Sequence, residues 1–141
     1  MKKYVYLLII VIIALTSIAY LYINYVNGAN NISSLNKDYE SLYNNVISGT
    51  TFATNINKIL DANSKNNVQK DENGYYLDNG ENSIIVEIKF KDSDNIFRIE
   101  QIYKNNISKF INLYANINFK CTKIEYHNRT KLVSYLYFEE I

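Results

Sequence analysis

The N-terminal part of this chain contains a long stretch without charge, and this stretch limits the fold more than any other feature. From Tyr4 to Asn36 there is no charged residue, and Tyr4–Val26 is almost wholly apolar. As an α-helix rising ~1.5 Å per residue, residues 4–26 would be ~35 Å long, slightly more than the ~30 Å hydrocarbon core of a bilayer. We therefore predict a transmembrane helix over residues 4–26, with the lipid bilayer as its partner.

The charges and aromatic residues around this stretch predict its direction. Lys2 and Lys3 precede it, and the first charges after it are Lys37 and Asp38. Basic residues favour the cytoplasmic side, so we expect a cytoplasmic N-terminus, with residues 27–141 outside the cell membrane. Tyrosine rings favour the headgroup level, and both ends of the stretch carry them: Tyr4, Tyr6, Tyr20, Tyr22 and Tyr25.

A cleaved signal peptide is the alternative interpretation. Ser17-Ile18-Ala19 has the small residues that a signal peptidase requires. However, apolar residues continue past this site through Leu21-Tyr22-Ile23, whereas the apolar part of a signal peptide is usually ~7–15 residues long. The single cysteine, Cys121, also excludes a lipobox. We therefore expect a retained single-pass anchor, and cleavage would still leave the domain outside.

The remaining chain, about 115 residues, is long enough for one domain and too short for two. Without Lys2 and Lys3 it carries 13 basic and 14 acidic residues that alternate in sign, which does not favour a nucleic-acid partner. A single cysteine excludes an internal disulfide. We expect Cys121 to be buried, since free cysteine is among the most buried residue types, with a cross-link to another chain as the alternative.

The composition is skewed towards Asn, Lys, Ile and Tyr, and it lacks proline and tryptophan. We attribute this skew to an AT-rich bacterial genome rather than to function. Tyrosines on expected strands are explained by β-propensity, although an exposed tyrosine face that recognises a glycan or a protein is the alternative. These tyrosines are Tyr75, Tyr76, Tyr126, Tyr135 and Tyr137.

Apolar spacing predicts the helices that follow the membrane span. Spacings of three and four predict that a helix continues outward to about Ser48 and packs on its own sheet, with self-association as the alternative. Ser48-Gly49 would end this helix, and Thr50 or Thr51 would cap a short helix to about Ala62. A further helix is expected over Ile107–Tyr114, capped by Asn105 or Asn106. The first of these helices carries the stripe Ile32, Leu35, Tyr39, Leu42 and Val46.

Alternation and turn residues predict the strands. Asn73-Gly74 and Asn79-Gly80 are strong hairpin signals, and Ile84–Phe90 alternates clearly. Ile96–Ile102 fits either a strand or a helix. Ile117–Tyr126 and Lys131–Phe138 would be the last two strands, joined by His127–Thr130, with a β-bulge near Thr122.

The expected fold class is α+β. A long N-terminal helix, transmembrane and then amphipathic, would pack on a small antiparallel β-sheet with one or two short helices. The expected segments are residues 1–26 as cytoplasmic tip and anchor, 27–48 as helical extension, and 49–141 as extracytoplasmic domain.

No group of residues predicts catalysis or metal binding. His127 is the only histidine and is expected in an exposed turn, six strand residues or roughly 20 Å from Cys121. Glu139 and Glu140 would point to opposite faces of a strand. The acidic turns Asp71-Glu72 and Asp92–Asp94 lack a calcium-binding loop. We therefore expect no enzyme activity, no cofactor, and no catalytic or metal-binding residues.

The segments Asp71–Tyr76, Ser83–Phe90, Phe119–His127 and Tyr135–Glu140 together resemble small single-span membrane proteins of Clostridium-like bacteria. The resemblance covers most of residues 48–141 and implies a class and a location, without an activity. In layout the chain also resembles type IV pilins and pseudopilins. It lacks the prepilin cleavage motif, because Lys3 is followed by Tyr4-Val5, and it lacks an early acidic residue in the apolar helix.

Two functions are compatible with these features. The favoured one is a structural or interaction module of the cell envelope with a pilin-like layout, which would bind an envelope protein or a second copy of itself. The alternative is an extracytoplasmic ligand-binding domain of cystatin-like or NTF2-like type, in which a helix and a curved sheet enclose a pocket.

The predicted helical extension leads to a truncation test. Removing the residues before Asn27 should preserve cooperative unfolding, because only the span is lost. Removal up to Ser48 should abolish it, since one wall of the core would be lost. Thermal unfolding followed by circular dichroism measures both, and a cooperatively unfolding fragment 49–141 would contradict the prediction.

Overall fold

A computed structural model describes residues 2–104 and 107–141, which form two units, Met1–Leu35 and Asn36–Ile141. Helix α1, Lys2–Glu40, makes up the first unit and ends within the second. Among the described residues, α1 is the only helix long and apolar enough to cross a membrane, and none of its most apolar part is buried. A signal sequence near an N-terminus is also long and apolar enough to meet this description.

The helix ends at Glu40, so the expected extension to Ser48 is wrong over its last residues. Asn44 has a φ of 59°, a left-handed conformation that ends a helix and that asparagine tolerates. Its N–H donates to the carbonyl oxygen of Cys121 at 2.9 Å. Val46–Ser48 then forms strand β1, which pairs with strand β4, Asn118–Tyr126. Residues Val46–Ser48, which the helical spacing placed in the N-terminal helix, therefore pair with the edge of β4 instead.

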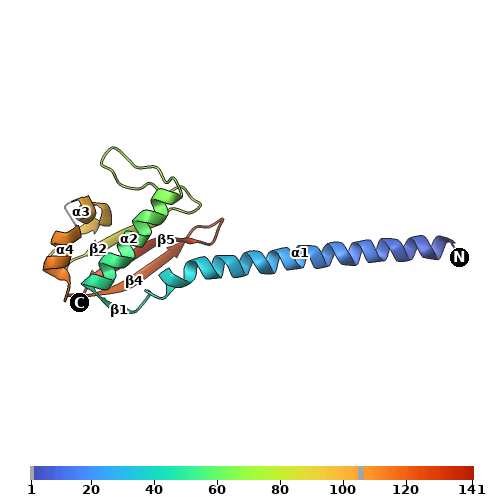
Figure 1. The fold of residues 1–141 in the computed structure, drawn as a ribbon, viewed down its shortest axis with the longest axis horizontal. Coiled ribbons are helices and arrows are strands. Elements are labelled where there is room, and N and C mark those ends of the chain that lie inside the picture. The colour runs from blue at the N-terminus through green and yellow to red at the C-terminus, as the bar shows by residue number, and fades with distance from the viewer. Residues whose placement is uncertain (1, 105–106) are drawn as a thin grey trace. The chain divides into compact units, whose positions relative to one another are not determined.

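The second unit contains a five-stranded sheet in the order β1-β4-β5-β2-β3 (Figure 1). The other strands are β2 (Ile85–Lys89), β3 (Ile96–Arg98) and β5 (Val133–Glu140). The α+β class is confirmed. The expectation of an antiparallel sheet is wrong at one pair, because β2 and β5 run parallel. The long connection between them brings the chain back to the same end of the sheet before β5 begins, as parallel pairing requires.

Within residues 2–104 and 107–141, three further helices accompany the sheet, one more than the largest number expected: α2 (Gly49–Lys65), α3 (Ile99–Lys104) and α4 (Ile107–Tyr114). Ser48 caps α2, accepting a hydrogen bond from the N–H of Thr51, so the expected C-cap at Ser48-Gly49 is wrong. A Cβ atom at Gly49 would overlap the carbonyl oxygen of Tyr114, which explains the glycine there. The expected caps Asn105 and Asn106 lie outside the described residues.

The two Asn-Gly pairs that were predicted to form hairpin turns lie in different kinds of loop. Gly74 adopts a φ of 86°, and Lys70 and Tyr76 form an antiparallel bridge across its turn, as a hairpin requires. Gly80 also has a positive φ, but its loop is closed by the side chain of Asn79 rather than by flanking strands. The ambiguous segment Ile96–Ile102 contains both β3 and the start of α3. The register shift between Cys121 and Lys123 confirms the bulge.

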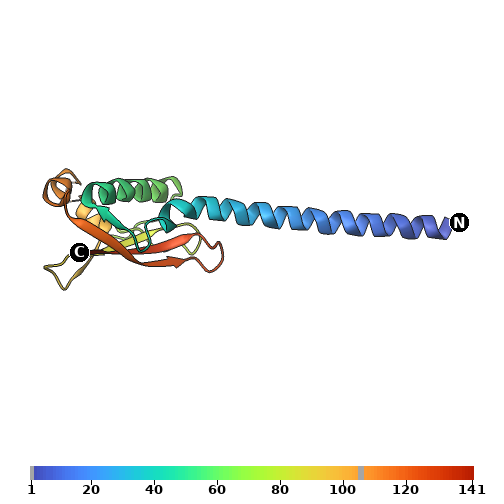
Figure 2. The same ribbon diagram turned by 90° about the horizontal axis from the view of Figure 1, so that it is seen from below.

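The core lies between α2 and one face of the sheet (Figure 2). Phe52 of α2 is 1% exposed. Its ring centroid is 4.9 Å from that of Phe119 and 5.0 Å from that of Phe138. Phe110 of α4 contacts it at 5.6 Å. Because truncating a buried phenylalanine usually costs about 3–5 kcal/mol, this aromatic cluster stabilises the α2–sheet contact strongly.

Two buried asparagines join helices to strands. Asn63 of α2 donates to the carbonyl oxygen of Ile84 and accepts from its N–H, both at 2.8 Å. Asn36 of α1 donates to the carbonyl oxygen of Lys131 at 2.8 Å and accepts from the N–H of Val133 at 2.9 Å. Each amide therefore satisfies one donor and one acceptor of the backbone where β2 or β5 begins.

Asn63→Ala should lower the free energy of unfolding by about 2–4 kcal/mol, because it leaves a buried N–H and a buried C=O of Ile84 unpaired at ~1–3 kcal/mol each. Urea unfolding of the variant measures the change. Asn57→Ala is the matched control, since Asn57 is exposed on the same helix. It should change stability by less than about 0.5 kcal/mol. Equal effects in the two variants would contradict the assigned role.

Candidate functional site

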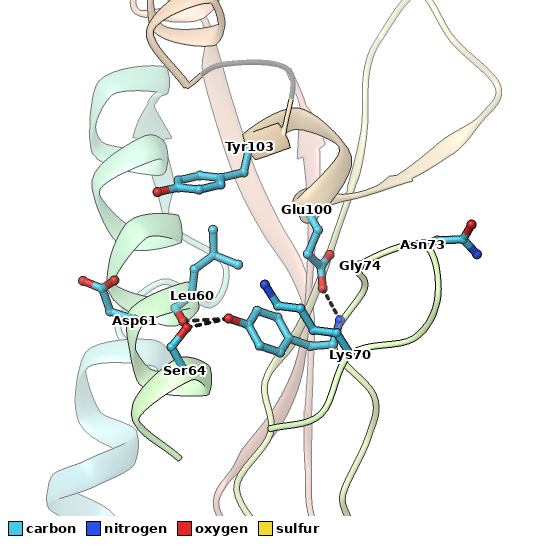
Figure 3. A pocket seen from close by; sticks show the side chains of 9 residues that line it. Leu60, Asp61, Ser64, Lys70, Asn73, Gly74, Glu100 and Tyr103 are labelled. Carbon is cyan, nitrogen blue, oxygen red and sulfur yellow. Dashed lines mark hydrogen bonds between the residues drawn. The ribbon is translucent and has the colours of Figure 1, made fainter. Parts of the chain in front are cut away.

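A cavity of about 340 Å³ lies between α2, α3 and the turn around Gly74 (Figure 3). The helix side is formed by the C-terminal half of α2. The opposite side is formed by α3 and by the residues of the Lys70–Tyr76 turn. The lining residues are Leu60, Asp61, Ser64, Lys70, Asn73, Gly74, Tyr76, Glu100 and Tyr103.

Tyr76 fixes one wall of this cavity. Its side chain is 3% exposed, and its hydroxyl group donates to the carbonyl oxygen of Leu60 at 3.3 Å. The same hydroxyl group lies 2.6 Å from the hydroxyl of Ser64. A buried tyrosine usually finds such partners for its hydroxyl group. The ring is therefore held in place before any ligand arrives.

An ion pair fastens the turn to α3. Arg98 donates from Nη2 to Oε1 of Glu100 at 3.0 Å, and Oε1 also accepts from the N–H of Tyr76 at 3.0 Å. The same Nη2 donates to the carbonyl oxygen of Tyr76 at 2.9 Å. The pair therefore satisfies both backbone groups of Tyr76.

Among the described residues, the second oxygen of Glu100 has no hydrogen-bond partner. Its side chain is only 8% exposed, and both Oε2 of Glu100 and Nε of Arg98 are buried without a hydrogen bond. A buried polar atom without a partner costs ~1–3 kcal/mol, and more when it is charged. Such atoms are uncommon in folded proteins, and this one belongs to a residue that lines the cavity.

Lys70 brings a cation to the same cavity. Its Nζ lies 4.3 Å from the centroid of the Tyr76 ring, a cation–π distance. Across residues 2–104 and 107–141, no acidic side chain lies within ion-pair distance of Lys70. The cavity lining therefore includes a carboxylate that is paired with Arg98, that of Glu100, and an exposed ammonium group, that of Lys70.

The expectation that His127 is an exposed turn residue is wrong. The side chain is 2% exposed, with Nε2 2.8 Å from the carbonyl oxygen of Ser83 and Nδ1 3.6 Å from Oδ1 of Asp78. Loop 78–83 covers the β4–β5 turn, and Thr130 donates to the carbonyl oxygen of Glu81. His127 therefore joins a loop to a hairpin. The hydroxyl group of Ser83 donates to Asp78 and not to the imidazole, which is not the arrangement of a catalytic triad.

Two of the other acidic candidates, Asp71 and Glu140, accept hydrogen bonds from the backbone. Oδ1 of Asp71 accepts from the N–H groups of Asn73 and Tyr75, so it closes its own turn. Glu140 accepts from the N–H of Lys91 at 3.2 Å. In the described part of the chain, His, Cys, Asp and Glu side chains do not gather in a group that could hold a metal.

Several tyrosine hydroxyl groups are engaged within the domain. Tyr135 donates to Glu87 at 2.7 Å, and Tyr126 donates to Glu40 at 3.1 Å. Tyr75 accepts from the side-chain amide of Gln101 at 2.7 Å. Burial raises the pKa of Tyr135, and its bond to Glu87 raises it further. These contacts favour the structural explanation of the tyrosines.

A second hollow of about 540 Å³ is more open and more aromatic. It lies beside the ring contact of Phe90 with Tyr114, whose centroids are 5.0 Å apart. The two buried atoms without a partner belong to Arg98 and Glu100, and neither residue lines this hollow. Its lining is mostly aromatic and aliphatic, with Gln101 and Lys109 as polar members.

No protein-family model, curated protein or solved structure matches this chain. The chemistry of the site therefore follows from its own residues.

Cys121 is fully buried in β4, as expected from its residue type, and its Sγ donates to the carbonyl oxygen of Lys123 at 3.4 Å. Burial raises the pKa of the thiol from 9.0 to about 11. Because the folded-state pKa is the higher one, this stabilising contribution is complete below about pH 9. It is lost as the pH rises towards 11.

At about pH 8, an aromatic disulfide reagent should label Cys121 of the native protein roughly a hundredfold more slowly than in the urea-unfolded protein, because only the thiolate reacts and the folded chain shields it. Absorbance of the released thiolate measures the rate. Equal rates in the native and unfolded states would show that the thiol is accessible.

Proposed function

We propose that this chain is a membrane-anchored extracytoplasmic structural or interaction module of the bacterial cell envelope, without catalytic activity. The observation that carries the proposal is the apolar part of α1, whose side chains are exposed throughout, joined to a domain with its own core. So much exposed apolar surface is strongly unfavourable in water, and a bilayer removes that cost.

The proposed orientation rests on charge. Lys2 and Lys3 precede the apolar stretch, and an excess of basic residues favours the cytoplasmic side. The domain would then lie outside the cell membrane as part of a single-pass protein. Its alternating charges and its single buried cysteine are compatible with that compartment.

The proposed interaction role rests on a pilin-like order of elements, with a helix followed by a sheet. Residues Asn36–Glu40 end α1 inside the domain unit, where Tyr39 packs against the core. An envelope protein or a second copy would be the partner. Because the prepilin motif is missing, the proposal does not include assembly into a fibre.

A second candidate function is ligand binding by an extracytoplasmic domain of cystatin-like or NTF2-like type. The specific observation in its favour is the cavity of about 340 Å³ beside α2, whose lining combines apolar, hydroxyl and charged side chains. A pocket with a few polar groups aimed inward is the usual form of a small-molecule site.

A C-terminal alkaline phosphatase fusion, active only outside the cytoplasm, tests the anchor and its direction. The wild-type fusion should be active and should resist alkaline carbonate extraction, because the helix stays in the bilayer. Replacing Lys2 and Lys3 with glutamate should lower the phosphatase activity by reversing part of the population. A variant with Lys65→Glu and Lys91→Glu has the same charge change outside the anchor and should behave as wild type.

Two results would contradict the proposal. A soluble product lacking the residues up to Ala19 would show a cleaved signal peptide, which mass spectrometry detects. Cross-linking in intact membranes should capture a protein partner or a second copy. Recovery of the monomer alone would contradict the interaction role. It would not bear on the proposed membrane anchor.

A further inference from the structure

We infer that Asn73 is a site of spontaneous deamidation, at which the folded chain converts a turn asparagine into aspartate and isoaspartate. Three of the four glycines in this chain follow an asparagine, at Asn27-Gly28, Asn73-Gly74 and Asn79-Gly80. Glycine has no side chain to block the approach to its own amide nitrogen, so an asparagine before it reacts most readily. The three pairs differ in what holds the asparagine side chain. The inference goes beyond the proposed function and does not depend on it.

The side chain of Asn73 is free to react. It is exposed, and within residues 2–104 and 107–141 its amide group makes no hydrogen bond. Figure 3 shows this amide directed away from the other residues that line the cavity. Gly74 has a φ of 86°, and its N–H donates to the carbonyl oxygen of Asp71 at 3.0 Å. Because a single hydrogen bond of a surface turn engages this nitrogen, local opening of the turn allows it to reach Cγ of Asn73.

The side chain of Asn79 is held in place, although its dipeptide is the same. Its Oδ1 accepts from the N–H groups of residues 81, 82 and 83 at 3.0, 3.0 and 3.1 Å, and its Nδ2 donates to Oδ1 of Asn82 at 2.7 Å. The N–H of Gly80 donates to Oδ1 of Asp78 at 2.8 Å, so this nitrogen is engaged once, as in the other turn. Turning the Asn79 amide towards Gly80 would break all four side-chain hydrogen bonds, each of which stabilises the loop. We therefore expect Asn79 to react far more slowly than Asn73.

The third pair, Asn27-Gly28, lies inside α1. In an α-helix each N–H donates to the carbonyl oxygen of the residue four positions earlier, and ψ is about −42°. This backbone conformation keeps a side-chain Cγ away from the next amide nitrogen. The helix therefore protects this pair.

The reaction exchanges ammonia for water. The nitrogen of Gly74 gives its proton to the solvent and bonds to Cγ of Asn73. The Cγ–Nδ2 bond then breaks, and Nδ2 takes up a proton and leaves as ammonia, so a cyclic succinimide remains. Water adds to one of the two carbonyl carbons of this ring, the bond from that carbon to the Gly74 nitrogen breaks, and the nitrogen regains a proton. Opening at Cγ gives aspartate, whereas opening at the backbone carbonyl carbon gives isoaspartate, and neither route needs an oxidant or a reductant.

Either product changes the cavity beside α2, because Asn73 and Lys70 both line it. A new carboxylate would join a lining that carries the exposed ammonium group of Lys70. Isoaspartate also adds a methylene group to the main chain, within a turn that the N–H of Asp71 closes by donating to the carbonyl oxygen of Tyr75 at 2.9 Å. The charge and the shape of this turn would therefore change as the chain ages.

The full chain in lipid nanodiscs, incubated for days at mildly alkaline pH, provides the test. Digestion after tyrosine separates Asn73 from Asn79, and mass spectrometry then follows the replacement of NH₂ by OH at each residue. We expect Asn73 to react at least roughly tenfold faster than Asn79, because four hydrogen bonds must first break at Asn79. In urea the two rates should become similar, since the dipeptide is the same.

Matched variants identify the site in the intact chain. Ion-exchange chromatography of aged wild-type protein should show an acidic form that is largely missing from Asn73→Gln, because the longer glutamine side chain closes the corresponding ring far more slowly. Asn57→Gln makes the same change at an exposed asparagine of α2 and should age as the wild type does.

Three results would overturn the inference. The first is a rate at Asn79 of the folded chain that equals or exceeds the rate at Asn73. The second is an unmodified Asn73 in the folded chain after a time in which the chain in urea is modified there. The third is the same amount of acidic form in aged Asn73→Gln and in aged wild type.

Discussion

The arrangement of the second unit depends on two buried asparagine side chains, Asn36 and Asn63. Each forms a donor and an acceptor bond with the backbone next to one of the two parallel strands, β5 and β2. A strand that begins beside a helix leaves backbone groups that the sheet does not pair, and burying them unpaired is costly. A planar amide with one donor side and one acceptor side removes this cost with a single residue. The end of α1 and the end of α2 are thereby joined to the centre of the sheet.

The candidate site follows the same principle with different groups. The backbone of Tyr76 also needs one acceptor and one donor, and it obtains them from Glu100 and Arg98. An asparagine side chain would use both of its polar atoms to bond the N–H and the C=O of Tyr76. The ion pair has more polar atoms than these two hydrogen bonds require. Oε2 of Glu100 and Nε of Arg98 remain unpaired, and Glu100 lines the cavity. The site is thus a consequence of fastening a turn with charged side chains.

Features with a local period were predictable from the sequence. The apolar span, strand β2, helix α4 and the bulge in β4 each repeat or shift within a few residues. Features created by distant contacts were not. The parallel pairing of β2 with β5 and the burial of His127 beneath loop 78–83 have no local signal. Asn36 and Asn63 also carry no local signal, because asparagine is abundant throughout this chain.

The candidate site has no local signal for a related reason. The apolar spacing of Ile96–Ile102 fits a strand or a helix and says nothing of Arg98 and Glu100, which lie within this segment and are both largely buried. A buried charge of each sign in a short segment indicates a pair, but its third partner, the backbone of Tyr76, is distant in sequence.

Exposed apolar surface on α1 is unfavourable wherever the chain is in water, so the proposed bilayer would contribute stability. Glu100 is a deficit of another kind, because its Oε2 is buried without a hydrogen-bond partner among the described residues. The charge of Arg98 beside it offsets part of that cost, and the pair remains because it holds the backbone of Tyr76.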